Sequence, residues 1–459
     1  SIASMRSAMT SRRDFPPRSP PAKSSTNTIA TSSLHFNRNR IFVHVTQMTR
    51  LFREEEAIFV SKRNNDFFRK KKDWSKVKDE LLGCYLKPYI SKILHTRKPL
   101  IYVDCFAGKG KFEDGSFGSP LIALKIIETE RMRSSAENPK IVSFFIELNH
   151  ADDLQKNLDS YPYAKVIHGK YEDRIENILK EKEGCNIFLY VDPYGIKALQ
   201  YALFDRFANG KFYSVELLVN MNSFGFIREG CRVFGVPFKE DIVLSELIEY
   251  EPTYMDRSEK SKRELDAIAG GEYWRRIIEA YKNELIDGYE AENQFAEQYC
   301  MRLRKSYNYV LNMPLRIKRG QRPKYRLIHA TNHRDGCLLM VDNICNRWES
   351  LRDIQSRGQL ELWGETTNNQ IVDDKFVQEK TKAFFSQYSV WISLHDGLAD
   401  FFMHNGPICS TKDVKKALRK LEKDRQIEVI REPVLTPTGK KTKFMEEDKG
   451  KRVKLRWRR

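Results

Sequence analysis

Short apolar runs alternate with amphipathic segments over residues 101–222. Uninterrupted apolar runs that are bounded by polar residues predict strands buried on both faces of a sheet. These runs are IYVDCF (101–106), IVSFFIE (141–147), AKVIHG (164–169), NIFLYVD (186–192) and YSVELLVNMN (213–222). The segments between them, and residues 73–94 before them, carry apolar residues at helical spacing. The pattern therefore predicts a parallel sheet that is covered by helices on both faces.

The pattern changes after the fifth run. Residues 226–305 have a mainly helical pattern and carry charges of both signs, so we expect a helical insertion there. Two further apolar runs, 307–317 and 324–332, flank the polar stretch KRGQRP and predict a hairpin that adds antiparallel strands to the sheet. A helix is expected over residues 335–348. Together these elements predict one Rossmann-like α/β domain over residues 70–350.

Both ends of the chain differ from this domain. Residues 1–65 are rich in Ser, Pro, Thr and Arg and lack an apolar period, so we expect a disordered basic extension. Residues 351–385 are expected to be a linker that contains helices. In residues 386–459, helices over 391–405 and 411–426 are followed by a strand, a Thr/Pro/Gly/Lys-rich loop and a second strand. This is the outline of a winged helix.

The positive charge is concentrated at the two ends. The formal net charge is +18. Residues 1–50 hold eight Lys/Arg and one acid, while residues 411–459 hold eighteen Lys/Arg and eight acids, so the two ends carry +7 and +10. Only about +1 is left for residues 51–410. A basic C-terminal end indicates a polyanionic partner, most simply nucleic acid, and the alternative is ordinary solvated surface charge.

Other features of the composition narrow the class of protein. The eight cysteines form no CxxC pair and no cluster with histidine, which argues against a zinc ribbon or a disulfide framework. No metal site is therefore expected. No run of about 18 apolar residues is present, so we expect no membrane span. We predict a cytoplasmic protein, and this expectation rests on the family resemblance described below.

The stretch YVDCFAGKGKFEDG, residues 102–115, places a glycine-rich loop directly after a predicted strand. It lacks both the GxxxxGK[ST] phosphate loop and the GxGxxG dinucleotide fingerprint. It fits the loop that binds S-adenosyl-L-methionine (AdoMet), in which an acid at the strand end faces the ligand ammonium and glycines permit close backbone approach. The alternative is an ordinary strand–loop–helix turn. The candidate cofactor residues here are Asp104, Phe106, Ala107, Gly108 and Gly110.

Acidic residues also end the second and fourth apolar runs. Glu147 is placed to accept hydrogen bonds from two ribose hydroxyls, with an ordinary surface acid as the alternative. Asp192 opens the stretch Asp-Pro-Tyr-Gly, at the carboxyl end of a buried strand, where open α/β sheets bind ligands. The alternative for Asp192 is a turn in which its side chain hydrogen-bonds nearby backbone.

At these residues the chain resembles the three-Cys-motif partner family, a group of class I AdoMet-methyltransferase-like proteins. The resemblance spans about residues 70–350 and rests on four stretches: YVDCFAGKGKFEDGSFGSPLIAL, IFLYVDPYG, VELLVNMNSFG and KYRLIHATNHRDGCLLM. It implies AdoMet as cofactor, with Glu147 on the ribose and Tyr171 or Asp173 near the adenine. It also implies a partner, a radical-AdoMet-like protein with a three-Cys motif.

DPYG is similar to the [DNS]PP[YF] motif of amino-directed nucleic-acid methyltransferases, although it has one proline rather than two. By that resemblance, Asp192 and the Pro193 carbonyl would accept hydrogen bonds from the target amino group, and Tyr194 would stack on an extruded base. The sequence thus predicts an AdoMet-dependent methyltransferase that acts on an exocyclic base amino group.

Several functional hypotheses remain open on the sequence alone. In the first, the chain is an AdoMet-dependent nucleic-acid methyltransferase, and basic and aromatic residues of its C-terminal segment bind the nucleic acid. They are Lys415, Lys416, Arg419, Lys440, Lys441, Lys443, Arg456 and Trp457. In the second, the chain is a non-catalytic nucleic-acid-binding partner of the radical-AdoMet-like protein. A nuclease is a third possibility, and a GxSxG hydrolase is disfavoured because that motif is absent.

Overall fold

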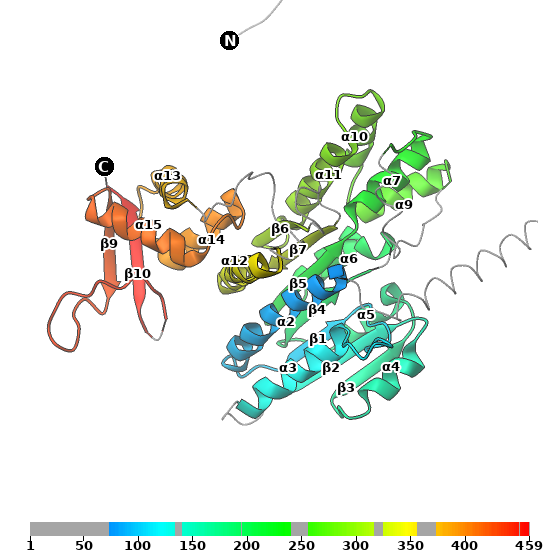
Figure 1. The fold of residues 1–459 in the computed structure, drawn as a ribbon, viewed down its shortest axis with the longest axis horizontal. Coiled ribbons are helices and arrows are strands. Elements are labelled where there is room, and N and C mark those ends of the chain that lie inside the picture. Colours follow the sequence, from blue (N-terminus) through cyan, green and yellow to red (C-terminus); the bar gives the residue numbers. More distant parts are fainter. Residues whose placement is uncertain are drawn as a thin grey trace, which may run out of the picture. The chain divides into compact units, whose positions relative to one another are not determined.

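The computed structural model describes residues 73–458, except 134–139, 194, 240–255, 316–324, 356–372 and 449. Its central feature is a seven-stranded sheet in the order β3-β2-β1-β4-β5-β7-β6 (Figure 1). The parallel strands are β1 (Leu100–Asp104), β2 (Ile141–Glu147), β3 (Ala164–His168), β4 (Asn186–Val191) and β5 (Ser214–Met221). The strands β6 (Tyr309–Leu315) and β7 (Tyr325–Thr331) form the predicted antiparallel pair, and β7 joins β5.

This sheet confirms the predicted fold class, a Rossmann-like and mostly parallel α/β sheet. The strand order reverses between β1 and β4, which is the point where open α/β sheets bind their ligands. Each central strand is buried along its whole length because helices cover both faces. In β1, for example, Tyr102 packs into one hydrophobic cluster and Val103 into the other.

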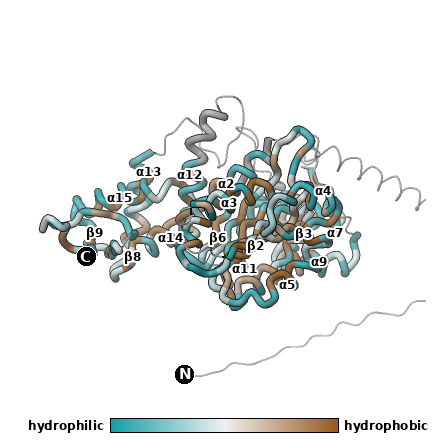
Figure 2. The backbone as a smooth tube through the Cα atoms, turned by 90° about the horizontal axis from the view of Figure 1, so that it is seen from below, coloured by the Kyte–Doolittle hydropathy of each residue, from teal (hydrophilic) through white to brown (hydrophobic). Residues whose placement is uncertain are grey.

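Two helical layers enclose the sheet. The helices whose buried residues pack with Tyr102 are α2 (Asp73–Leu94), α3 (Ser119–Arg133), α4 (Ala151–Leu158) and α12 (Arg334–Gln355). On the other face, α5 (Tyr171–Leu179), α6 (Tyr201–Ala208) and α7 (Ser223–Phe234) follow the strands, and the short 3₁₀ helix η1 (Lys197–Leu199) precedes α6. In Figure 2 the hydrophobic stretches gather along this sheet, around β2 and β6, and continue into α14.

Within the described residues, the predicted helical insertion contains α9 (Glu259–Ala269), α10 (Tyr273–Lys282) and α11 (Gly288–Leu303), together with most of α7. Its apolar side chains pack on the second face of the sheet, where the rings of Phe226 and Phe295 stack with centroids 3.9 Å apart. A buried ion pair joins the insertion to β7, because Nε and Nη2 of Arg326 donate to the two oxygens of Glu292, at 2.8 and 2.7 Å. The insertion is therefore an integral part of the second helical layer.

The C-terminal elements are α13 (Asp374–Phe385), β8 (Ile392–Ser393), α14 (Leu394–Asn405), α15 (Thr411–Lys423), β9 (Ile427–Glu432) and β10 (Arg452–Trp457). The strands form an antiparallel sheet in the order β8-β10-β9. The predicted succession of helix, helix, strand, long loop and strand is present, and the name winged helix stays a prediction. Because Lys416 of α15 pairs with Asp374 at 2.6 Å, α13 from the predicted linker belongs with these elements.

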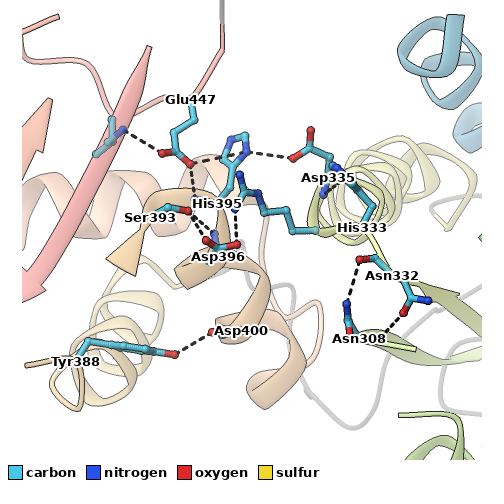
Figure 3. Close-up of polar contacts among 12 residues, drawn as sticks. Asn308, Asn332, His333, Asp335, Tyr388, Ser393, His395, Asp396, Asp400 and Glu447 are labelled. Atoms are coloured by element: carbon cyan, nitrogen blue, oxygen red, sulfur yellow. Dashed lines mark hydrogen bonds and ion pairs between the residues drawn. The ribbon is translucent and has the colours of Figure 1, made fainter. Parts of the chain in front are cut away.

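Polar contacts and a shared core attach the C-terminal elements to α12. Arg334 pairs with Asp396 at 2.6 Å, and the ring of His395 lies between Asp335 and Glu447 (Figure 3). The hydrogen bond from His395 holds the pKa of Asp335 well below its usual range. Buried side chains of α12, α14 and α15 also belong to one hydrophobic cluster.

Two remaining predictions concern residues 1–65 and membrane-spanning segments. The basic extension predicted for residues 1–65 lies outside the described residues. Within the described ranges, no helix is both long and apolar enough to cross a membrane.

Candidate functional site

The glycine-rich loop after β1 needs glycine at two positions. Gly108 and Gly110 have φ angles of 60° and 74°, in the left-handed region that side chains disfavour. A Cβ on Gly110 would also lie 2.9 Å from Cδ1 of Leu154. The amide of Gly118 donates to the carbonyl of Gly110 at 2.9 Å and closes the loop just before α3. These contacts fix the course of the loop, and Gly108 and Gly110 border the pocket described below.

Asp104 ends β1 and is fully buried. Its Oδ1 accepts the Phe106 amide at 3.2 Å, and its Oδ2 accepts the Ser119 hydroxyl at 2.7 Å. Burial raises the pKa of Asp104 to about 7, although these two hydrogen bonds oppose the shift. The carboxyl group therefore holds the loop against the start of α3 and lies beneath the surface that a ligand would touch.

Glu147 supports the same loop from β2. Its Oε2 accepts the Gly108 amide at 2.8 Å, and its Oε1 accepts the amides of Asn149 and His150 at 2.8 and 3.1 Å. A carboxylate offers about four acceptor positions, so three of them are used by backbone. The structure thus gives Glu147 a role in shaping the loop, and its predicted contact with a ribose stays a prediction.

Tyr171 begins α5 and is buried. Its ring lies beside that of Phe106, with centroids 5.4 Å apart, and burial raises the pKa of its hydroxyl well above the usual value. Among the described residues, none hydrogen-bonds this hydroxyl. Tyr171 therefore packs behind the loop, on the side of β1 that faces α5.

Asp192 follows β4 and is the best-held polar side chain of the site. Lys78 of α2 donates to both of its oxygens, at 2.8 and 2.6 Å, and Asn220 of β5 donates to Oδ1 at 2.7 Å. Lys78 is only 8% exposed, so the ion pair is largely shielded from solvent. An aspartate placed at this depth requires such partners.

Lys78 and Asn220 were not predicted as site residues, although the sequence contains a signal for each. Lys78 stands three, four and seven residues before Leu81, Leu82 and Tyr85, so it occupies the apolar stripe of α2. A lysine in that position is rarely buried without a partner. Asn220 lies near the carboxyl end of the buried strand β5, where a polar side chain also needs a partner.

These residues border one pocket of about 70 Å³ at the carboxyl ends of β1, β4 and β5. Of the predicted residues, those that line it are Phe106, Ala107, Gly108, Gly110, Asp192 and Pro193. Asp104, Glu147 and Tyr171 lie behind this lining, and Tyr194 lies outside the described residues. The volume holds about five waters, which is less than a whole nucleoside needs.

The polar groups of the pocket fit an amino-acid end group such as that of AdoMet. Lys78, Lys109 and Lys111 supply positive charge for a carboxylate, and Asp79 and Asp192 supply negative charge for an ammonium group. The Oδ1 atom of Asn220 is buried and accepts no hydrogen bond from the described residues, so it can take one from a ligand. No diphosphate cradle is present in the loop, in agreement with the failed phosphate-loop motif.

The predicted nucleic-acid residues fall into two groups. Lys440, Lys441 and Lys443 are exposed on the loop between β9 and β10, and Arg419 is exposed on α15, while Lys415 is half-buried there. The other three are held by neighbours. Lys416 pairs with Asp374, Arg456 pairs with Glu428 at 2.7 Å, and Trp457 is partly buried against the hydrophobic cluster.

The guanidinium of Arg456 also lies over the ring of Trp391, 4.6 Å from its centroid. Trp391, which is 37% exposed, was not among the predicted residues.

In the part of the chain that the structure describes, no three His, Cys, Asp or Glu side chains are placed to hold a metal ion.

Comparisons with known proteins add little to this geometry. No protein-family model matches the chain, and no curated protein sequence matches it. Among the solved structures that resemble it is a loganic acid methyltransferase with SAH, at 9% sequence identity and a TM-score of 0.25. The match covers 57% of this chain and 97% of that one. At this TM-score the likeness is too weak for inference, and the fold assignment rests on the sheet order.

Proposed function

We propose that the chain is an AdoMet-dependent methyltransferase that acts on nucleic acid, at an exocyclic amino group of a base. The observation that carries the proposal is that Asp192 and Pro193 border the same pocket as Gly108 and Gly110. The glycine loop would hold the cofactor, which supplies the methyl group. Asp192 would accept a hydrogen bond from the target amine and orient its nitrogen lone pair.

The nucleic-acid part of the proposal is supported by charge. Residues 411–459 carry +10, and Lys440, Lys441 and Lys443 project from one loop with no acidic partner among the described residues. Such lysines fit phosphate contacts, which set affinity and salt dependence rather than sequence choice. The three-Cys-motif partner resemblance remains part of the proposal, with its radical-AdoMet-like protein as a second partner.

The first test is calorimetric titration of AdoMet and S-adenosylhomocysteine into the full chain. We expect binding in the wild type and its loss in Gly110→Ala, with Gly115→Ala as the matched control, because Gly115 has φ 82° but no atom within 4 Å of its Cβ. Transfer of a labelled methyl group to DNA and RNA, with Asp192→Ala, then tests catalysis. Absence of binding to either ligand would refute the proposal.

The nucleic-acid arm is tested by the salt dependence of binding. Replacing Lys440, Lys441 and Lys443 together by alanine should lower the slope of log K against log salt by about 0.9 for each phosphate that is no longer neutralised. The control is Lys416→Ala, whose ammonium is engaged by Asp374. An unchanged slope in the triple variant would show that this loop does not bind phosphates.

One observation favours the second hypothesis, a non-catalytic binding partner. Both oxygens of Asp192 are engaged by Lys78, and Oδ1 is also engaged by Asn220. A carboxylate held in this way is already paired and would serve structure alone. Stable complex formation with nucleic acid, without methyl transfer to any DNA or RNA, would favour that hypothesis.

A further inference from the structure

The floor of the pocket contains a chain of polar contacts that couples α2, β4 and β5. Lys78 reaches Asp192 from α2, and Asn220 reaches the same carboxylate from β5. Lys78 and Asn220 are 8% and 2% exposed, so both side chains are shielded from bulk water. Both residues nevertheless border the pocket, as Asp192 does.

The carboxylate of Asp192 has little acceptor capacity left in this arrangement. Its Oδ1 accepts from Lys78 at 2.8 Å and from Asn220 at 2.7 Å. Its Oδ2 accepts from Lys78 at 2.6 Å and from the hydroxyl of Tyr190 at 3.4 Å. Since a carboxylate has about four acceptor positions, a target amino group finds a good one only if Lys78 withdraws.

Asn220, in contrast, has an acceptor atom that no described residue uses. Its Nδ2 is used by Asp192, whereas its Oδ1 is buried and accepts from no described residue. Buried acceptors without a donor are rare and costly, and each calls for an explanation. A ligand with a hydrogen-bond donor at this point of the pocket would satisfy it.

From these contacts we infer that Lys78 and Asn220 bind the amino-acid end of the cofactor. Lys78 pairs with its carboxylate, and Oδ1 of Asn220 accepts from its ammonium group. Lys78 thereby moves from Asp192 to the ligand, and Asp192 regains acceptor positions for the target amine. The inference rests on the proposed function and deepens it, because it makes cofactor binding the step that prepares Asp192.

The experiment compares two ligands that differ only in the carboxylate, AdoMet and decarboxylated AdoMet, by calorimetry on the full chain. A charge-assisted contact to Lys78 should make AdoMet bind the wild type about tenfold more tightly or better. Lys78→Met should remove that preference by weakening AdoMet alone. Lys87→Met, which replaces an exposed lysine of α2 that does not border the pocket, is the matched control and should keep it.

Asn220→Ala gives a contrasting pattern. Both ligands carry the ammonium group, so we expect this variant to weaken both by a similar factor. The inference is overturned if the wild type binds the two ligands equally, if Lys78→Met weakens both equally, or if Asn220→Ala weakens neither. If the wild type binds neither ligand, the proposed function itself fails. The wild-type comparison requires no variant, so the inference stays testable even if Lys78→Met does not fold.

Discussion

Replacing Asp104 by asparagine should stabilise the folded protein, and the gain should be larger at neutral pH than at acid pH. Burial raises the pKa of this carboxyl from 3.8 to about 7. The folded state therefore binds the proton more tightly than the unfolded chain does. Stability of the wild type falls as the pH rises from the unfolded pKa to the folded pKa, and this contribution is then constant.

The magnitude follows from the two pKa values of Asp104. At 1.36 kcal/mol per pKa unit, the ionised carboxyl costs about 4 kcal/mol of folding free energy at pH 8. At pH 5 the same linkage leaves a cost of about 1.7 kcal/mol, because the folded-state carboxyl is still protonated. Asparagine has no such cost, and it can keep the contacts to Phe106 and Ser119, since an amide both accepts and donates.

Urea unfolding followed by circular dichroism at pH 5, 6, 7 and 8 measures this difference. The stability advantage of Asp104→Asn over the wild type should grow by about 2.5 kcal/mol between pH 5 and pH 8. Asp159→Asn, which removes an exposed carboxylate, controls for the loss of one charge. A change below about 0.5 kcal/mol would refute the claim that Asp104 is ionised at a cost.

Three further predictions concern the loop, the junction and the insertion. Gly110→Ala should destabilise the protein more than Gly115→Ala. Both variants incur about 1–2 kcal/mol of left-handed strain, but only the new Cβ at Gly110 would contact Leu154. Urea unfolding of the two variants measures the difference, and equal losses of stability would contradict the prediction. Asp342→Ala should lower the free energy of unfolding by about 1–2 kcal/mol, because Asp342 accepts both the amide and the hydroxyl of Thr411 at 2.8 Å. Amide hydrogen exchange should then become faster in α15 but not in β1. An equal increase in both elements would argue against a local role. Arg326→Met should cost about 3–5 kcal/mol, because it leaves Glu292 buried without its ion-pair partner; a stability decrease below about 1 kcal/mol in thermal unfolding would show that Glu292 finds another partner.

The fold was predictable because its strands carry a strong local signal. Strands such as β4 are buried at every position, and the helices between the strands have clear periodicity, so the alternation alone indicated a parallel sheet. The antiparallel pair at the sheet edge was also predicted, from the polar stretch between two apolar runs. What local pattern did not show was the place of α13, because its partner on α15 lies 42 residues further along the chain.

The site was predictable only in part, for a related reason. Asp192 and the glycine loop were predicted to lie together, and they border one pocket, because strand ends are visible in the sequence and converge at one sheet edge. Lys78 was missed because its partner is 114 residues away, and only its position on the apolar stripe of α2 distinguishes it from other lysines. Sequence pattern also could not tell that Asp104 would be covered by Ser119 and the Phe106 amide, since that depends on how the loop folds back.

The shared core between α12 and the C-terminal helices bears on the modularity of the chain. Buried side chains of α12, including Val341 and Ile344, belong to the same cluster as Leu398 of α14 and Leu418 of α15. Cutting the chain in the 351–385 region would therefore leave an apolar face on both fragments. For this reason the basic C-terminal segment cannot be exchanged as an independent domain. A change in what it binds has to be made by substitutions on its exposed surface, while the face toward α12 is preserved.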